Sequence, residues 1–475
     1  MRNFLPTIFI TISCAAQSAP EPAPVERIVV SPSGHFLQYA DGRPFFWLAD
    51  TAWLLFEKLD RADAGKYLED RRQKGFNVVQ AVLLHGADEL GPNGSRALME
   101  GDPAKPNLQA NGYWDDVDWV VDRAAEKGIY VAMVPAWGSL VKTGRLNMTN
   151  AAPFATFLAG RYKDRVNIFW ILGGDVRGDQ DGEVWRLMGR TLQAGDPHHL
   201  ITFHPFGRTQ SSMWFADEPW LAFNMFQSGH QRYDQDTDSP HRYGEDNWRY
   251  VSEDYARQPA KPVLDGEPSY EGIPQGLHDN SQPHWTAADC RRYAYWSVFA
   301  GACGHTYGDN AVMQFYRPGI DHGAYGARES WSEALHDPGS GEMQYLKRLM
   351  LSRPYFERVP DESVIAGRNG ERYNYVIATR GTSYLFAYTY TGKPFRVRMG
   401  AITGARVRAW WYSPRDGSAG AFGTLANRGV RTFTPPGKPA DGNDWVLVLD
   451  DASVTFAAPG LSQERRPITR AKPAE

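Results

Sequence analysis

Short apolar runs alternate with longer amphipathic stretches from about residue 43 to residue 350. The short runs are rich in Val, Ile, Phe and Trp and have the length of buried strands. They predict eight strands, at residues 45–49, 77–84, 129–135, 166–172, 199–203, 221–225, 262–265 and 302–306.

The stretches between these strands have the apolar spacing of helices. The clearest predict helices at residues 60–74, 114–127, 152–162, 184–192, 242–256, 287–299 and 341–351. Eight βα units in succession favour a closed parallel barrel over a doubly wound sheet. We therefore predict a (β/α)8 TIM barrel at residues 27–354.

The pattern changes after Pro354 to short β-rich runs separated by Gly, Pro, Asn and Asp. The runs at 374–379, 383–390, 395–399, 406–412 and 445–449 predict antiparallel strands. This spacing is typical of a small all-β sandwich, which we place at residues 355–459. Residues 460–475 are polar and are expected to form a flexible tail.

The N-terminus has the features of an export signal. Arg2 precedes an apolar stretch from Phe4 to Ile12, and small residues follow. This stretch is too short to span a bilayer, so no transmembrane segment is expected. We predict a signal peptide and linker at residues 1–26 and an exported protein, periplasmic or extracellular. An alternative is a lipid anchor on Cys14.

Composition narrows the classes of partner. The chain has 51 basic and 55 acidic residues, a net charge of −4, so no nucleic-acid partner is expected. Aromatic residues make up 13% of the chain. Most must lie in the core, but a minority at a cleft would suit sugars. Only Cys290 and Cys303 follow the leader, as buried free thiols or as a disulfide.

Catalytic residues of such barrels lie where the strands end and in the loops that follow. The predicted strand ends are unusually polar, with Gln227 next to the sixth. They carry Asp50, His85, Trp137, Asp175, Arg177, His204, Asn224, Glu267, Tyr270 and His305. The pattern predicts a site for a polar ligand, although each histidine could instead be a hydrogen-bonded structural residue.

Two of these residues are carboxylates at strand breaks. Asp175 follows a buried strand and two glycines, and Glu267 lies between Gly266 and Pro268. Glycoside cleavage needs such a pair, one acid to protonate the leaving oxygen and one carboxylate to attack or to activate water. Each could instead cap a helix or pair with an arginine, as Asp175 could with Arg177. The pair in one barrel favours catalysis.

Metal-dependent hydrolysis is the weaker alternative. The first strand has no His-x-His motif, and no lysine suited to bridging two metal ions is evident. The sequence also has no nucleotide-binding glycine loop and no metal-binding cysteine set. We therefore expect neither a metal nor a cofactor.

The sequence resembles the apiosidase-like glycoside hydrolases, glycoside hydrolase family 140. The resemblance spans about Val29 to Arg353 and is carried by GRPFFWLADTAW at 42–53, GFNVVQ at 75–80, WILGGD at 170–175 and DGEP at 265–268. WWYSPRDG at 410–417 and NDWVLVL at 443–449 resemble the collagen-binding-type β-domain that accompanies this barrel.

The resemblance implies a retaining hydrolase with Asp175 as acid/base and Glu267 as nucleophile. It also implies apiosyl linkages in side chains of the pectic polysaccharide rhamnogalacturonan II as the substrate. The other polar residues at the strand ends are then expected to bind sugar. Two alternatives stay open: a retaining glycosidase or endoglycanase on another polysaccharide, and a non-catalytic carbohydrate-binding protein.

Overall fold

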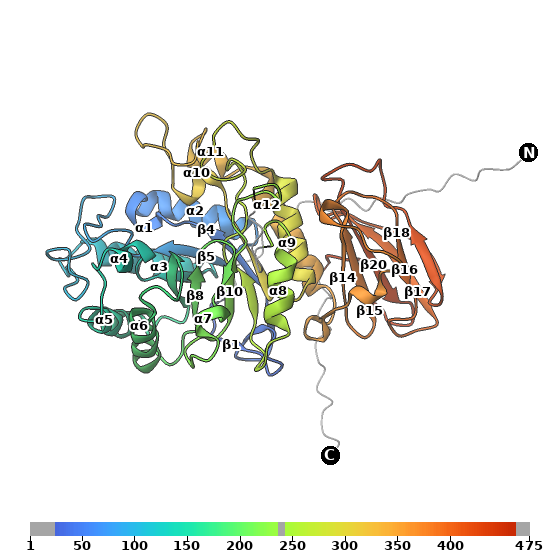
Figure 1. Cartoon of the computed structure of the whole chain (residues 1–475), viewed down its shortest axis with the longest axis horizontal. Coiled ribbons are helices and arrows are strands. Elements are labelled where there is room, and N and C mark those ends of the chain that lie inside the picture. Colours follow the sequence, from blue (N-terminus) through green and yellow to red (C-terminus); the bar gives the residue numbers. More distant parts are fainter. Residues whose placement is uncertain (1–23, 236–242, 462–475) are drawn as a thin grey trace, which may run out of the picture.

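The computed structural model describes residues 24–235 and 243–461 (Figure 1). The predicted signal sequence with Cys14, and nearly all of the predicted tail, lie outside these residues. The chain forms a β/α unit followed by an all-β unit (Figure 1). None of the described helices is long and apolar enough to cross a membrane.

The β/α unit is built on eight parallel strands. They are β4 (Trp47–Thr51), β5 (Val78–Val82), β6 (Tyr130–Val134), β7 (Ile168–Val176), β8 (Ile201–Pro205), β10 (Asn224–Gln227), β11 (Val263–Asp265) and β12 (Gly304–Tyr307). One parallel sheet has the order β12-β4-β5-β6-β7-β8, and β10 pairs with β11. Backbone bonds from Ala222 to Ile201 (2.8 Å) and from Cys303 to Val263 (2.9 Å) close the ring. The predicted barrel is confirmed.

Helices surround this ring. The longer ones are α2 (Arg61–Gln73), α3 (Tyr113–Glu126), α5 (Ala151–Tyr162), α6 (Gly182–Gly195), α8 (Asn247–Tyr255), α9 (Ala287–Phe299) and α12 (Pro338–Leu351). Short helices lie in the loops after the strands: α1 (Leu55–Lys58), α4 (Gly138–Lys142), α7 (Ser212–Phe215), α10 (Asn310–Met313) and α11 (Trp331–Ala334). Two-residue β9 (Thr209–Gln210) pairs with β10.

A small antiparallel sheet precedes the barrel and was not predicted. It contains β1 (Ile28–Val30), β2 (Leu37–Tyr39) and β3 (Pro44–Phe45). The Tyr130 hydroxyl, at the start of β6, donates a hydrogen bond to the Glu26 carbonyl beside this sheet. The sheet therefore lies at the N-terminal end of the barrel, opposite the end where catalytic groups are expected.

The all-β unit packs two layers. A six-stranded sheet contains β13 (Val359–Pro360), β14 (Val376–Arg380), β15 (Tyr384–Thr389), β20 (Trp445–Asp451), β17 (Arg406–Tyr412) and β18 (Ala419–Ala426). Strands β16 (Phe395–Arg398) and β19 (Val430–Phe433) form the second layer. The 3-10 turns η1 (Tyr355–Glu357), η2 (Glu362–Val364) and η3 (Arg372–Asn374) complete the unit.

The six-stranded sheet has two differently covered faces. Val397 and Phe433 from the second layer pack on one face, with Leu447 and Leu449 of β20. The other face packs on α9 and α12, where the rings of Tyr295 and Tyr388 stack at 4.8 Å. The sheet is thus joined to the barrel through a continuous apolar layer.

Buried ion pairs cross the same interface. Arg353 donates two hydrogen bonds to Asp450, each of 2.8 Å, and both side chains are at most 1% exposed. Arg291 of α9 binds Asp444 at 2.9 Å. Cys290 and Cys303 are free and buried, so the expected thiols are confirmed.

Candidate active site

Asp175 lies in a break at the end of β7. The pairing of β7 with β8 shifts register between Gly173 and Val176, so that Gly174 and Asp175 form a bulge. The φ angles of Gly173, Gly174 and Asp175 are 93°, 100° and 49°, all in the left-handed region. Bulges of this kind turn a side chain towards an active site, and a left-handed aspartate is strained.

Both glycines are required by close packing as well as by conformation. A Cβ atom on Gly173 would lie 2.4 Å from the His204 carbonyl oxygen, and one on Gly174 would lie 2.5 Å from the Trp137 ring. Any larger residue would push the strand or the ring away. The sequence WILGGD therefore fixes the position of the acid through its backbone.

Glu267 follows β11, with two histidines on its carboxylate. His230 Nε2 hydrogen-bonds to Oε1 at 3.0 Å. His204 Nε2 lies 3.0 Å from Oε2, at an angle unfavourable for a hydrogen bond. Glu267 is 6% exposed and His204 is fully buried. The carboxylate is therefore held from two sides at the inner wall of the barrel.

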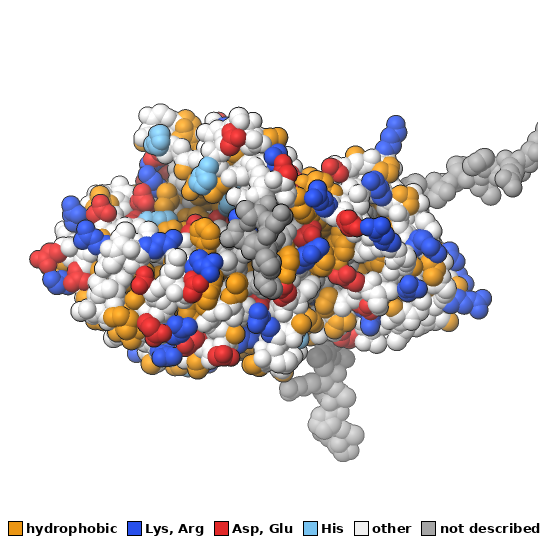
Figure 2. Space-filling view, viewed as in Figure 1, with side chains coloured by type: hydrophobic (Ala, Val, Ile, Leu, Met, Phe, Trp, Pro, Cys, Tyr) orange, Lys and Arg blue, Asp and Glu red, His pale blue; other side chains and the backbone are white. Residues whose placement is uncertain are grey.

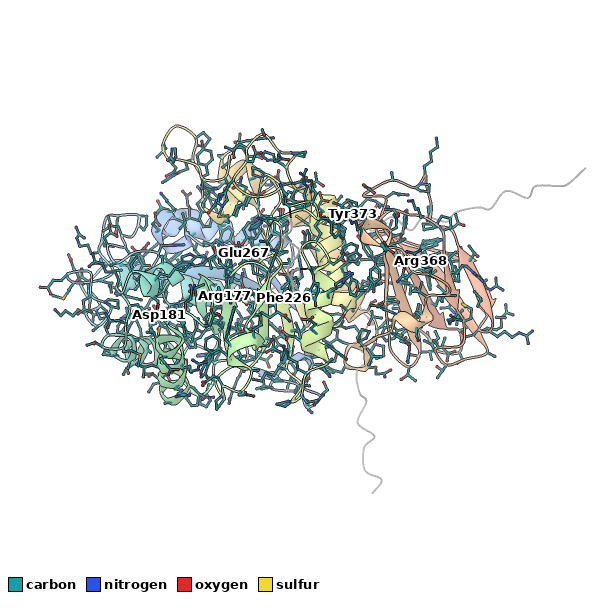
Figure 3. All side chains as sticks on the ribbon, in the orientation of Figure 1. Arg177, Asp181, Phe226, Glu267, Arg368 and Tyr373 are labelled. Atoms are coloured by element: carbon teal, nitrogen blue, oxygen red, sulfur yellow. The ribbon has the colours of Figure 1, made fainter. Side chains whose placement is uncertain are left out.

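The two acids lie close together. One oxygen each from Asp175 and Glu267, with one nitrogen of His204, all lie within 4.8 Å of one another. Figure 3 shows Glu267 and Arg177 within the barrel half of the molecule, far from Arg368 of the β-domain. We call this end of the barrel, around Asp175 and Glu267, the mouth.

Their surroundings shift the two pKa values in opposite directions. Burial and then the charge of Glu267 raise the pKa of Asp175 to about 6. Burial alone would raise the pKa of Glu267 too, but contact with His204 and His230 lowers it overall. Burial also opposes protonation of His204, yet the neighbouring acids raise its pKa above the usual value. At neutral pH the mouth therefore holds an ionised glutamate beside an aspartate that protonates readily.

Aromatic rings form one wall of the mouth. Trp137 lies with its ring centre 5.3 Å from that of Trp53, 5.2 Å from His85 and 5.8 Å from His204. Burial lowers the pKa of His85 to about 4, so this ring is neutral and can donate or accept. Such a wall suits the apolar face of a sugar ring.

Further residues complete the mouth. The Tyr270 ring lies 4.7 Å from His230, and the charges of Glu267 and Asp175 both act on its hydroxyl. The same two charges reach Tyr325, in the loop after β12. Gln227, at the end of β10, lies close enough to Asp175 to lower the pKa of that carboxyl in part. Sequence analysis missed His230, Trp53 and Tyr325.

Three residues expected to bind substrate do not reach the mouth. Asp50 points outward and accepts hydrogen bonds of 2.6 Å from Tyr67 and from Arg71 on α2. His305 lies in register with Leu48, which packs against the helices, and both are fully buried. Asn224 begins β10, at the opposite end from Gln227.

The first two errors have one cause, and the third another. Strands of a parallel barrel are buried on both faces, so apolar alternation does not reveal which residues point inward. For strand six, the apolar run at 220–223 placed the prediction at 221–225, whereas the strand starts at Asn224. Arg177 is at the mouth, but its guanidinium binds Asp179 at 2.7 Å and stacks on Trp214.

Asp175, His204 and Glu267 are also the one group of donors in the described residues spaced to hold a metal ion. Both Glu267 oxygens already face histidine nitrogens at 3.0 Å. Two carboxylates at this spacing also match the acid pair of a glycosidase.

Comparison with known proteins now identifies the class. Residues 31–357 match the family model described as "Apiosidase-like, catalytic domain". The chain belongs to this apiosidase-like family. Residues 359–450 match a second model, "Putative collagen-binding domain of a collagenase". The chain is therefore an apiosidase-like glycoside hydrolase with an accessory β-domain.

Two solved structures are similar to this apiosidase-like chain over nearly their whole length. One, named a glycoside hydrolase, is 48% identical with a TM-score of 0.88, covering 90% of this chain and 98% of its own. The other, described as a glycoside hydrolase family 5 protein from Bacteroides vulgatus, is 45% identical with a TM-score of 0.88, covering 92% and 96%. No curated protein matches the chain.

Proposed function

We propose that the chain is a retaining glycoside hydrolase in which Asp175 is the acid/base and Glu267 the nucleophile. The observation that carries this proposal is the approach of the two acids to within 4.8 Å. Retaining enzymes hold their carboxyl groups about 5–5.5 Å apart, whereas inverting enzymes need about 6.5–9.5 Å for an intervening water. The spacing here is that of the retaining class.

The opposite pKa shifts support the same roles. Glu267, kept ionised by His204 and His230, attacks the anomeric carbon while protonated Asp175 gives its proton to the departing oxygen. The product is a glycosyl ester of Glu267. Asp175, now ionised, takes a proton from water, and the hydroxide attacks the same carbon to release the sugar and regenerate Glu267.

We further propose that the bond cleaved is an apiosyl linkage in side chains of rhamnogalacturonan II, so that the enzyme takes part in pectin degradation. The support is the family match over residues 31–357. Fold alone does not fix a substrate. The leader-like residues 1–26 support export to the periplasm or the exterior, with Cys14 as a candidate lipid anchor.

Chemical rescue tests the two roles. With an activated substrate and azide, Glu267→Ala should regain turnover and give a product of inverted configuration, because azide replaces the nucleophile. Asp175→Ala should keep its first step on that substrate and give an azide product of retained configuration. Opposite stereochemistry would exchange the roles. Near-normal activity of both variants on a natural oligosaccharide would refute the assignment of both acids.

Product analysis tests the linkage. The protein is incubated with defined pectic oligosaccharides that carry or lack apiosyl residues, and the released sugars are identified. Release of an apiosyl unit or an apiose-linked chain is expected. Cleavage of only the oligosaccharides without apiose would keep the mechanism and replace the substrate.

A further inference from the structure

An exposed aromatic side chain lies beside Asp175, the proposed acid. Phe206 is 43% exposed and directly follows β8. Figure 2 shows that apolar side chains reach the surface of the barrel half among charged ones, and single exposed apolar residues of this kind need no function. Position, rather than exposure, therefore distinguishes Phe206.

Alternation along β8 places Phe206 on the inner side of the barrel wall. The Phe203 ring packs outward on rings of α6 and α7, with ring centres 5.9 and 4.6 Å away. The next residue, His204, faces inward to Glu267. The Phe206 N–H continues the strand ladder by binding the Val176 carbonyl at 3.0 Å. Phe206 is therefore again on the inner side, roughly 7 Å nearer to solvent than His204.

Lys142 connects Phe206 to the backbone of Asp175. This lysine is the last residue of α4 and is exposed. Its Nζ donates a hydrogen bond of 3.0 Å to the Asp175 carbonyl and lies 5.9 Å from the centre of the Phe206 ring. An ammonium group has three N–H donors, so this hydrogen bond leaves others for a ligand at the same place.

The turn that carries Phe206 is fixed at the mouth. The Phe206 carbonyl accepts a hydrogen bond of 3.1 Å from the Thr209 N–H. A Cβ atom on Gly207, the next residue, would lie 3.6 Å from the Gln227 side chain, which neighbours Asp175. The backbone of Phe206 is therefore held in place before any ligand binds.

The leaving half of the substrate must lie on the Asp175 side of the mouth. In the mechanism proposed above, Asp175 gives its proton to the departing oxygen while Glu267 attacks the anomeric carbon from the opposite side. A sugar ring attached through that oxygen therefore lies next to the acid, where Phe206 and Lys142 are. The apolar face of such a ring stacks on an aromatic ring, and its oxygens accept hydrogen bonds from an ammonium group.

We propose that Phe206 and Lys142 form the subsite for the sugar on the leaving side of the cleaved bond, with Phe206 against its ring and Lys142 on one of its oxygens. The inference rests on the proposed retaining mechanism and adds that the leaving group is a sugar ring rather than a small alcohol. The same subsite holds an acceptor sugar. The acceptor hydroxyl attacks the anomeric carbon of the glycosyl ester, gives its proton to Asp175 and releases the Glu267 carboxylate. Transfer to a sugar then competes with hydrolysis.

Two substrates with the same glycosyl unit test the subsite. One is the pectic oligosaccharide identified by product analysis, and the other is the glycosyl fluoride of the released sugar, whose leaving group has no ring. Phe206→Ala should lower the ratio of kcat/KM for the oligosaccharide to kcat/KM for the fluoride roughly tenfold, because the aromatic contact with the leaving sugar is lost. Lys142→Gln should lower the same ratio about threefold, as expected for one exposed charge.

Two further variants control for the type of side chain and for its position. Phe206→Tyr keeps an aromatic ring and should keep the ratio. Leu351→Ala also truncates an exposed apolar side chain, 36% exposed, but at the end of α12, away from the mouth, and should leave the ratio unchanged. Melting temperatures check that each variant is folded. An unchanged ratio in Phe206→Ala, or an equal fall in Leu351→Ala, would overturn the proposal.

Product stereochemistry separates this proposal from the proposed mechanism. With the leaving-side sugar added in excess, a retaining enzyme forms a transfer product of retained configuration, and Phe206→Ala should form roughly tenfold less of it relative to hydrolysis. An inverted first product without any transfer product would refute the retaining mechanism, while the two-substrate ratio would still report on Phe206. A retained product with an unchanged ratio would refute the subsite alone.

Discussion

The mouth and the interface between barrel and β-domain both bury charges, but they treat them differently. At the interface, Arg353 donates two hydrogen bonds to Asp450, so two opposite charges are held in a fixed geometry. In the mouth, Asp175 and Glu267 lie together, and the nitrogens nearest to Glu267 belong to histidines. An ion pair holds its two side chains in one geometry. Two neighbouring carboxylates instead raise the pKa of one of them, so that this group can take up and release a proton near neutral pH.

The difference shows that burial alone does not decide the chemistry of an acidic side chain. Asp450 and Asp175 are both acids in mostly buried surroundings, and partners set their chemistry. Asp450 is bound by Arg353 at 2.8 Å, whereas burial and then the charge of the neighbouring Glu267 raise the pKa of Asp175. The following substitutions test this contrast.

Loss of the nucleophile should have the largest effect. Glu267→Ala should lower kcat/KM by about 10⁴-fold or more on a natural oligosaccharide, a loss typical of removing a nucleophile. Asp265→Asn is the matched control, two residues earlier and buried, because it binds Ser228 and Asn247 outside the mouth. It should lower the melting temperature and cost less than about tenfold in kcat/KM. Equal losses in both would remove the special role of Glu267.

Breaking an interface pair should act on stability instead. Arg353→Met leaves the buried Asp450 side chain without its partner, so the free energy of unfolding should fall by about 3–5 kcal/mol. The double variant Arg353→Met/Asp450→Leu should recover much of this loss in denaturant titrations. The kcat/KM of folded protein should stay unchanged in both. Unchanged stability of the single variant would contradict the assigned role.

Substitutions of two histidines distinguish residues inside the mouth from residues outside it. His230→Ala removes a hydrogen bond to the Glu267 carboxylate and should reduce kcat/KM by roughly 10- to 100-fold. His305→Leu, which replaces a buried histidine outside the mouth, should leave kcat/KM within about twofold. The reverse pattern would restore the strand-end residue predicted from sequence.

The smallest effect concerns pH. Asp175 must be protonated to act as the acid, and its raised pKa keeps it so up to about pH 6. On substrates with poor leaving groups, kcat/KM should therefore fall as pH rises through that value. Because the Glu267 charge contributes to the shift, Glu267→Gln should lower the pKa of Asp175, measured by carbon NMR of the labelled carboxyl. An unchanged pKa would mean that burial alone sets it.

The sequence predicted the barrel, the β-domain and the two acids because each leaves a local pattern. Alternating apolar and amphipathic stretches predict βα units, and glycines before Asp175 and Glu267 mark strand ends. Strands β18 and β19 were missed because β18 is largely exposed and rich in Gly and Ala. His230 was missed because it lies in an irregular loop and reaches Glu267 only through the fold.

Helix α9 is part of the barrel and also forms the surface on which the β-domain packs. Its backbone follows the seventh barrel strand, while its Tyr295 and Arg291 hold the β-domain through Tyr388 and Asp444. Only the short turn η1 (Tyr355–Glu357), with Tyr355 itself buried, joins the two units along the chain. A recombination placed at this turn would therefore separate Tyr295 and Arg291 from their contacts with Tyr388 and Asp444, so the β-domain is not an interchangeable module.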